Sequence, residues 1–118
     1  MKFYKNRETG ELLTLMDNES ADLTGFEEII PNTVDAAKEK HVPVVSREGQ
    51  TVTVTVGETA HPMLDNHYIE WIILETETGM ERRELSPGEE PVAQFYCPED
   101  SRIIAAYESC NLHGIWKA

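Results

Sequence analysis

Thr51–Val56 is the segment that most restricts the fold, because threonine and valine alternate there without interruption. Successive side chains of a β-strand point to opposite faces, so this pattern predicts a strand with valines on one face and threonines on the other. Val92–Tyr96 and Ile103–Tyr107 are two more short runs of strand-forming residues, and Ser86–Gly88 is a turn signal ahead of them. Short strands at this spacing predict an all-β chain folded as an immunoglobulin-like β-sandwich.

Two further segments extend the predicted sheets. His67–Leu74 is predicted as a strand in which alternate side chains, from His67 to Ile73, share one face. Glu81–Leu85 is predicted as the strand that returns after a turn.

A short helix is predicted over Val34–Glu39, because Asn32 and Thr33 can cap its first turn. Pro43 disfavours helical backbone at the residue before it, so this helix should end near Lys40.

The N-terminal part of the chain reads differently. Residues 2–16 predict a β-hairpin, with strands Lys2–Lys5 and Leu12–Met16 on either side of a turn at Glu8–Gly10. The polar stretch Asp17–Gly25 predicts a linker.

Composition excludes several classes of function. The 118 residues carry a formal net charge of −12, which argues against binding nucleic acid or an anionic membrane surface. No apolar run approaches the roughly 18 residues that a membrane span needs. The first eight residues are too polar for a secretory signal, so we expect a cytoplasmic protein. Two cysteines are too few for a disulfide scaffold.

The four histidines, at positions 41, 61, 67 and 113, all fall in loops or at the ends of predicted elements. Strand ends converge at the rims of a sandwich, so these side chains could meet there. Cys110 lies three residues before His113, a spacing that suits metal ligation. Imidazole and thiolate together suit iron, zinc or copper, so spacing alone makes a metal site plausible without choosing the metal.

Four segments that contain these residues resemble, in the same order, the iron-site motifs of the superoxide reductases (desulfoferrodoxin and neelaredoxin). They are Glu39-Lys40-His41-Val42-Pro43, His61-Pro62-Met63, His67-Tyr68-Ile69-Glu70-Trp71-Ile72 and Cys110-Asn111-Leu112-His113-Gly114-Ile115-Trp116-Lys117. Residues 32–38 resemble the lead-in to the first motif, and the resemblance covers about residues 29–118. It accounts for every histidine in the chain.

The resemblance implies one mononuclear non-haem iron that cycles between Fe²⁺ and Fe³⁺. Its implied equatorial ligands are His41, His61, His67 and His113, and its implied axial thiolate is Cys110. It also implies that Glu39 occupies the sixth position in the ferric state and that Lys40 is a cation beside the open position. Cys97 has no ligand role in the family pattern, and we expect an ordinary thiol.

The implied activity is the one-electron reduction of superoxide to hydrogen peroxide at the open sixth site. The family resemblance also implies a rubredoxin-type electron donor and a homodimer or higher homo-oligomer. Lys40 and the positive charge of the iron centre would steer superoxide inward despite the acidic surface.

The N-terminal segment departs from the family pattern. Residues 4–10 resemble the first motif of a desulforedoxin-like domain, which binds a second iron through four cysteines, but Asn6 and Thr9 stand where cysteines would be. We therefore predict that residues 1–28 are a vestigial desulforedoxin-like segment without metal and that residues 29–118 form the iron-binding domain.

Three other functions are open on the residues alone. A blue-copper electron carrier normally uses two histidines, a cysteine and a weak axial methionine, and no methionine follows His113. A structural zinc site would use four ligands and leave Glu39 and Lys40 without a role. A non-enzymatic immunoglobulin-like binding module would bind no transition metal.

Overall fold

The computed structural model describes residues 1–16 and 23–118. Nearly all of its regular structure is β-strand, and the described residues contain one helix of a single turn. The elements, in chain order, are β1 (Phe3–Asn6), β2 (Leu12–Thr14), β3 (Phe26–Ile29), α1 (Lys38–His41), β4 (Pro43–Glu48), β5 (Thr51–Val56), β6 (Ile69–Thr76), β7 (Gly79–Glu84), β8 (Val92–Tyr96), β9 (Ile103–Cys110) and β10 (Gly114–Lys117). None of the helical residues described forms a segment long and apolar enough to cross a membrane.

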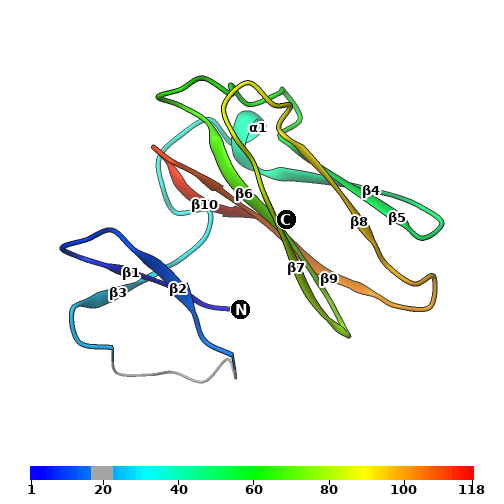
Figure 1. The fold of residues 1–118 in the computed structure, drawn as a ribbon, viewed down its shortest axis with the longest axis horizontal. Helices are drawn as coiled ribbons and strands as arrows, with labels where there is room; N and C mark the ends of the chain where they lie inside the picture. Colours follow the sequence, from blue (N-terminus) through cyan, green and yellow to red (C-terminus); the bar gives the residue numbers. More distant parts are fainter. Residues whose placement is uncertain (17–22) are drawn as a thin grey trace.

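Two antiparallel sheets pack face to face and form the predicted β-sandwich (Figure 1). One sheet has the strand order β10-β9-β6-β7, and the other has the order β4-β5-β8. Their inner faces enclose a core that includes Val52, Val54, Val56, Ile69, Ile72, Leu74, Phe95 and Ala106. The all-β sandwich expected from the sequence is confirmed.

The alternating segment behaves as its pattern predicts. β5 spans Thr51–Val56, and the side chains of Val52, Val54 and Val56 are completely buried between the sheets. The threonines point away from this core and are exposed or half-buried. Each fully buried valine contributes roughly 1.5–3 kcal/mol to folding.

The strand predicted over His67–Leu74 begins later and does not keep one face. β6 starts at Ile69, and its pairing with β9 shifts register at a bulge between Ile69 and Trp71. Because the bulge adds a residue, Ile69 packs in the sandwich core, whereas Trp71 and Ile73 point to the opposite side of the sheet. The prediction that these residues share a face is therefore wrong.

The helix predicted over Val34–Glu39 is also wrong in its position. α1 begins at Lys38, after Ala37, and no side chain caps it. Asn32 has a positive φ of 66° and is bound elsewhere: its side chain accepts the Lys117 N–H at 2.8 Å and donates to the Lys117 carbonyl at 3.1 Å. The helix ends at His41, one residue after the predicted end at Lys40. The backbone at Val42, the residue before Pro43, is extended, as expected for a residue that precedes proline.

A third sheet, with strand order β2-β1-β3, forms from the N-terminal residues. The predicted hairpin is present as the antiparallel pair β1 and β2, and β3 was not predicted. Most of the predicted linker, residues 17–22, lies outside the described residues. The sheet packs on the outer face of the β10-β9-β6-β7 sheet through a second apolar cluster, which includes Phe3, Ile73, Ala105, Tyr107 and Ile115.

Phe3 is the central contact of this second cluster. Its ring stacks on Trp71 at a centroid distance of 5.8 Å and meets the edge of Tyr107 at 5.2 Å. Phe3→Ala is therefore expected to lower the free energy of unfolding by about 3–5 kcal/mol, measured by urea denaturation. Leu12→Ala is the control, since Leu12 is 38% exposed and should cost much less. Equal losses for the two variants would contradict the role given to Phe3.

Candidate metal centre

Five side chains from separate segments meet at one rim of the sandwich. His41 ends α1, His61 lies in the loop after β5, and His67 precedes β6 in an isolated bridge with Leu64. Cys110 is the last residue of β9, and His113 lies in the turn that leads to β10. The structure thus brings together all five residues that the sequence indicated as ligands.

The four imidazole rings follow one another in a closed circuit. The ring centroids lie 4.8 Å apart for His41 and His61, 4.7 Å for His61 and His67, 5.3 Å for His67 and His113, and 5.0 Å for His113 and His41. Adjacent rings are inclined by 73–88°. Such a circuit gathers the four imidazole rings in one place.

Backbone carbonyls select which nitrogen of each buried ring is available. His41 Nδ1 lies 2.7 Å from the Ala37 carbonyl, and His61 Nδ1 lies 2.7 Å from the Pro62 carbonyl. A carbonyl only accepts hydrogen bonds, so each Nδ1 carries the proton and each Nε2 keeps a free lone pair. Both Nε2 atoms are therefore prepared as metal ligands.

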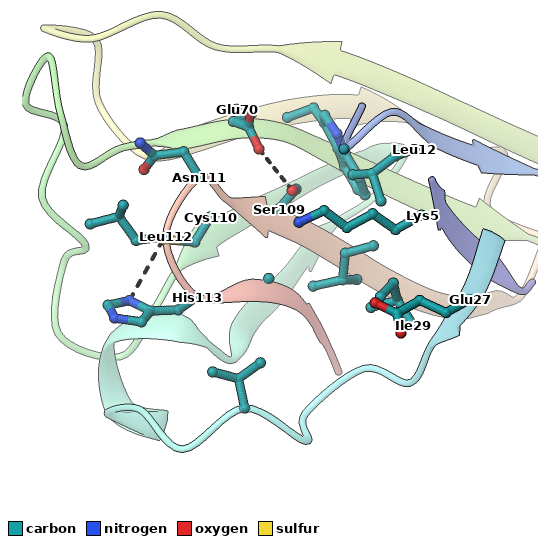
Figure 2. Close-up of a pocket in the computed structure, with 15 residues that line it drawn as sticks. Lys5, Leu12, Glu27, Ile29, Glu70, Ser109, Cys110, Asn111, Leu112 and His113 are labelled. Atoms are coloured by element: carbon teal, nitrogen blue, oxygen red, sulfur yellow. Dashed lines mark hydrogen bonds between the residues drawn. The ribbon is translucent and has the colours of Figure 1, made fainter. Parts of the chain in front are cut away.

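His113 differs from His41 and His61 in the ring nitrogen that it directs toward the cluster. His113 Nδ1 lies 3.2 Å from His41 Nε2 and 3.9 Å from Cys110 Sγ. Figure 2 marks the contact with Cys110 by a dashed line. His113 consequently faces the centre through Nδ1, whereas His41 and His61 face it through Nε2.

The donor atoms fit a single metal ion. Ligand atoms of His41, His61, His67 and Cys110 all lie within 4.8 Å of one another, and His113 lies beside them. The Nε2 atoms of His61 and His67 are buried and have no hydrogen-bond partner among the described residues. Buried polar atoms normally have partners, so these two lone pairs point to a ligand such as a metal cation. Imidazole and thiolate are suitable ligands for iron, zinc or copper.

Burial sets the protonation states of these groups. It lowers the pKa of His61 to about 4, and it also lowers the pKa of His41 and His67. The imidazoles of His41, His61 and His67 are thus neutral and able to coordinate a cation at neutral pH. Burial raises the pKa of the Cys110 thiol, while the backbone N–H groups of Leu112 and His113 partly oppose that rise. Cys110 becomes a thiolate when a bound cation offsets the cost of burying its charge.

Glu39 and Lys40 lie on the exposed side of the cluster. Both belong to α1 and are exposed, next to the buried His41. The charge of Glu39 raises the pKa of His41, against the larger lowering by burial, and the charge of Lys40 helps to lower the pKa of His67. The two side chains therefore act electrostatically on the cluster from its solvent side.

The profile of the family described as Desulfoferrodoxin matches residues 33–118. The chain belongs to the desulfoferrodoxin family. A desulfoferrodoxin from Clostridium acetobutylicum is 38% identical over 122 residues, which cover 100% of this chain and 95% of the relative. A desulfoferrodoxin homolog from Archaeoglobus fulgidus is 49% identical over 86 residues, or 73% of this chain and 67% of the relative.

Solved structures of superoxide reductases have the same fold. The enzyme from Treponema pallidum is 38% identical and superposes with a TM-score of 0.81, over 99% of this chain and 97% of that chain. The superoxide reductase (1Fe-SOR) from Giardia intestinalis is 35% identical, with a TM-score of 0.58 over 69% of this chain and 96% of that chain. The first similarity therefore includes the N-terminal sheet of this desulfoferrodoxin-family chain.

Two residues that the sequence did not single out support the cluster. Trp116 stacks on His41 at a centroid distance of 5.0 Å and donates its indole N–H to the His113 carbonyl at 3.0 Å. The Asn111 side chain accepts the Tyr68 N–H at 2.9 Å and donates to the Asn66 carbonyl at 3.1 Å, which joins the loop of Cys110 to the loop of His67. Both lie inside the last resembling motif, which was the only sequence signal for them.

Glu108 is a further unpredicted feature of this desulfoferrodoxin-family chain. Its side chain is completely buried, and neither carboxylate oxygen has a hydrogen-bond partner among the described residues. Burial raises the pKa of Glu108 to about 9, and the charge of Glu70 adds to the effect. A negative charge on a Cys110 thiolate would raise the pKa of Glu108 further.

The raised pKa of Glu108 predicts a pH-dependent stability. Between about pH 4.5 and pH 9 the folded chain keeps a proton that the unfolded chain has lost, so stability falls by roughly 1.4 kcal/mol per pH unit. From pH 6 to pH 8, the free energy of unfolding of the wild type should therefore fall by about 3 kcal/mol more than that of Glu108→Gln. Urea denaturation at both pH values measures this difference. Parallel losses in the two proteins would show that Glu108 does not stay protonated.

A cavity of about 480 Å³ lies between the N-terminal sheet and the strand end that carries Cys110 (Figure 2). Lys5, Leu12 and Glu27 line it on one side, and Ser109, Cys110 and His113 line it on the other. Within it, Ser109 Oγ donates to a Glu70 carboxylate oxygen at 3.0 Å. The N-terminal sheet is therefore part of the surroundings of the cluster, although it contributes no ligand.

Proposed function

We propose that this protein is a superoxide reductase, which converts superoxide, one electron and two protons into one molecule of hydrogen peroxide. The observation that carries this proposal is the closed circuit of four imidazoles beside one cysteine, with two buried nitrogens that have no hydrogen-bond partner in the part of the chain that the structure describes. When bound here, iron would supply the Fe²⁺/Fe³⁺ couple and a coordination position for superoxide. The superoxide reductases of similar fold support this activity.

The proposed ligands are His41, His61, His67 and His113, with Cys110 as the thiolate. With five protein donors, a bound iron ion would still have room for one further ligand, such as a diatomic substrate. The five donors also exceed the four ligands of a closed tetrahedral zinc site. The circuit of four imidazoles is larger than the two histidines of a blue-copper site, so neither alternative is favoured.

Lys40 has two proposed roles. Its ammonium group adds a local positive charge on the exposed side of the cluster, which attracts the superoxide anion even though the whole chain carries −12. Screening over about 8 Å at physiological salt makes this nearby charge more important than the distant ones. Lys40 also orders the water that delivers a proton to the product, a general-acid role by relay.

Glu39 has the proposed role of sixth ligand when the protein is oxidised. It lies in α1 beside His41, and its charge acts on that ring. A carboxylate from this position would occupy the free place until an electron arrives.

The remaining proposals concern partners and location. The electron donor is proposed to be rubredoxin or a similar small carrier, the assembly a homodimer or higher homo-oligomer, and the compartment the cytoplasm. Residues 1–28 are proposed to be a metal-free remnant of a desulforedoxin-like domain, and their described part supplies most of the third sheet.

Iron analysis, optical spectroscopy and pulse radiolysis test the proposed function together. Protein reconstituted anaerobically should bind iron at one ion per chain and, once oxidised, show a thiolate-to-iron charge-transfer band. The reduced protein should remove superoxide without releasing oxygen. Exclusive binding of zinc, or superoxide decay at the rate of buffer alone, would reject the proposal.

A further inference from the structure

Gly57 makes an unusually close backbone contact next to the cluster. It follows β5 through a cis peptide bond and lies against the backbone of α1. A Cβ atom at this position would lie 2.7 Å from the Glu39 carbonyl oxygen, 2.8 Å from the Lys40 carbonyl carbon and 3.1 Å from the His41 nitrogen. All three are backbone atoms, which cannot yield as the tip of a flexible side chain can.

The contact joins the two segments that supply half of the imidazole circuit. α1 carries Glu39, Lys40 and His41, and the loop after Gly57 leads to His61. Hydrogen bonds fix the loop at both ends: the Thr59 N–H donates to the Glu39 carbonyl at 2.8 Å, and the His61 N–H donates to the Val56 carbonyl at 2.9 Å. Any widening at Gly57 would therefore separate His41 from His61, whose rings now lie 4.8 Å apart.

The absent side chain is what matters at this position. The glycines that have positive φ values are Gly10, Gly25, Gly49, Gly88 and Gly114. Gly57 is not among them, so a need for left-handed backbone does not explain it. The space for a side chain is instead filled by the backbone of α1.

We infer that Gly57 is a positioning residue of the metal site, whose missing side chain lets α1 approach the His61 loop and so sets the placement of His41, Glu39 and Lys40. This inference rests on the proposed function. Supporting residues outside the ligand shell commonly change metal affinity by about 10–100-fold, and a methyl group forced between these two segments acts on two ligands together.

The test compares Gly57→Ala with Gly79→Ala in the full-length protein. Gly79 begins β7, has no positive φ, and has nothing within 4 Å of the Cβ that alanine would add. Gly57→Ala is expected to weaken Co²⁺ binding by about 10–100-fold and to shift the charge-transfer band of the iron-loaded, oxidised protein. Gly79→Ala should retain wild-type values for both.

A merely structural role gives a different result. If Gly57→Ala lowers only the melting temperature of the metal-free protein, with wild-type Co²⁺ affinity and a wild-type ferric spectrum, the inference is overturned. The measurement of Co²⁺ affinity requires neither iron nor superoxide. The inference about Gly57 can therefore be wrong while the proposed function is right, and the proposed function can be wrong while the inference is right.

A second pair of variants covers the case in which Gly57→Ala does not fold. Thr59→Pro removes the N–H that binds the Glu39 carbonyl, and Thr59→Ala keeps it. Thr59 is exposed, so neither change disturbs the core. Weaker Co²⁺ binding in Thr59→Pro, with wild-type binding in Thr59→Ala, would support the inference, and wild-type binding in both would overturn it.

Discussion

Cys110→Ser is expected to abolish superoxide reduction and the charge-transfer band of the oxidised protein. The Cys110 sulfur is buried at the end of β9, 3.9 Å from His113 Nδ1, and receives two backbone N–H groups. A bound cation can deprotonate this thiol, but a serine hydroxyl loses its proton far less readily and binds soft metals poorly. Pulse radiolysis of the reduced variant should show superoxide decaying at the rate of buffer alone.

Cys97→Ser is the matched control for this prediction. Cys97 is also a fully buried free thiol, but its sulfur lies near the carbonyls of Pro98 and Ser101, away from the histidines. This control should keep the band and the rate, with at most some loss of stability. A Cys110→Ser protein that retained both signals would remove the cysteine from the centre.

Lys40→Ala is expected to slow superoxide capture by about tenfold at low salt, within the range that electrostatic steering produces. The deficit should shrink as salt rises, because screening weakens the attraction that the wild type has and the variant lacks. Pulse radiolysis across a series of ionic strengths measures the rate and its salt slope.

Lys38→Ala provides the comparison on the same helix. Lys38 is exposed at the start of α1, and the pKa lowering of His67 involves the charge of Lys40. The loss of the Lys38 charge should slow superoxide capture less than the loss of the Lys40 charge does. Equal rates and equal slopes in Lys40→Ala and the wild type would exclude steering by Lys40.

The alternation of apolar and polar residues predicted those strands that have one buried face and one face toward solvent. β5 alternates because one of its faces is buried between the sheets and the other points outward, and β8 was located for the same reason. β10 was not predicted, because its four residues follow a turn and depend on pairing with β9. β3 depends in the same way on β1. Such pairing is a tertiary effect that a short window of sequence does not contain.

The ligand set was predicted by family resemblance rather than by spacing. Histidine positions made a metal site plausible, and the motifs singled out the five residues that the structure brings together. The choice of ring nitrogen was not predictable, since it depends on carbonyls such as those of Ala37 and Pro62. The bulge in β6 and the contact at Gly57 were likewise invisible, because both arise from strands and loops that are distant in the chain.

The packing of the third sheet has a consequence for how such a chain could be shortened. Six consecutive residues of β9, from Ala105 to Cys110, are buried, because one face of the strand looks into the sandwich and the other lies under the N-terminal sheet. Removal of the first 28 residues would leave the metal ligands in place but would expose Tyr107, Ile115 and Ile73 together. Such an apolar patch favours self-association. A relative that dispensed with the third sheet would need polar side chains at those positions to remain in solution.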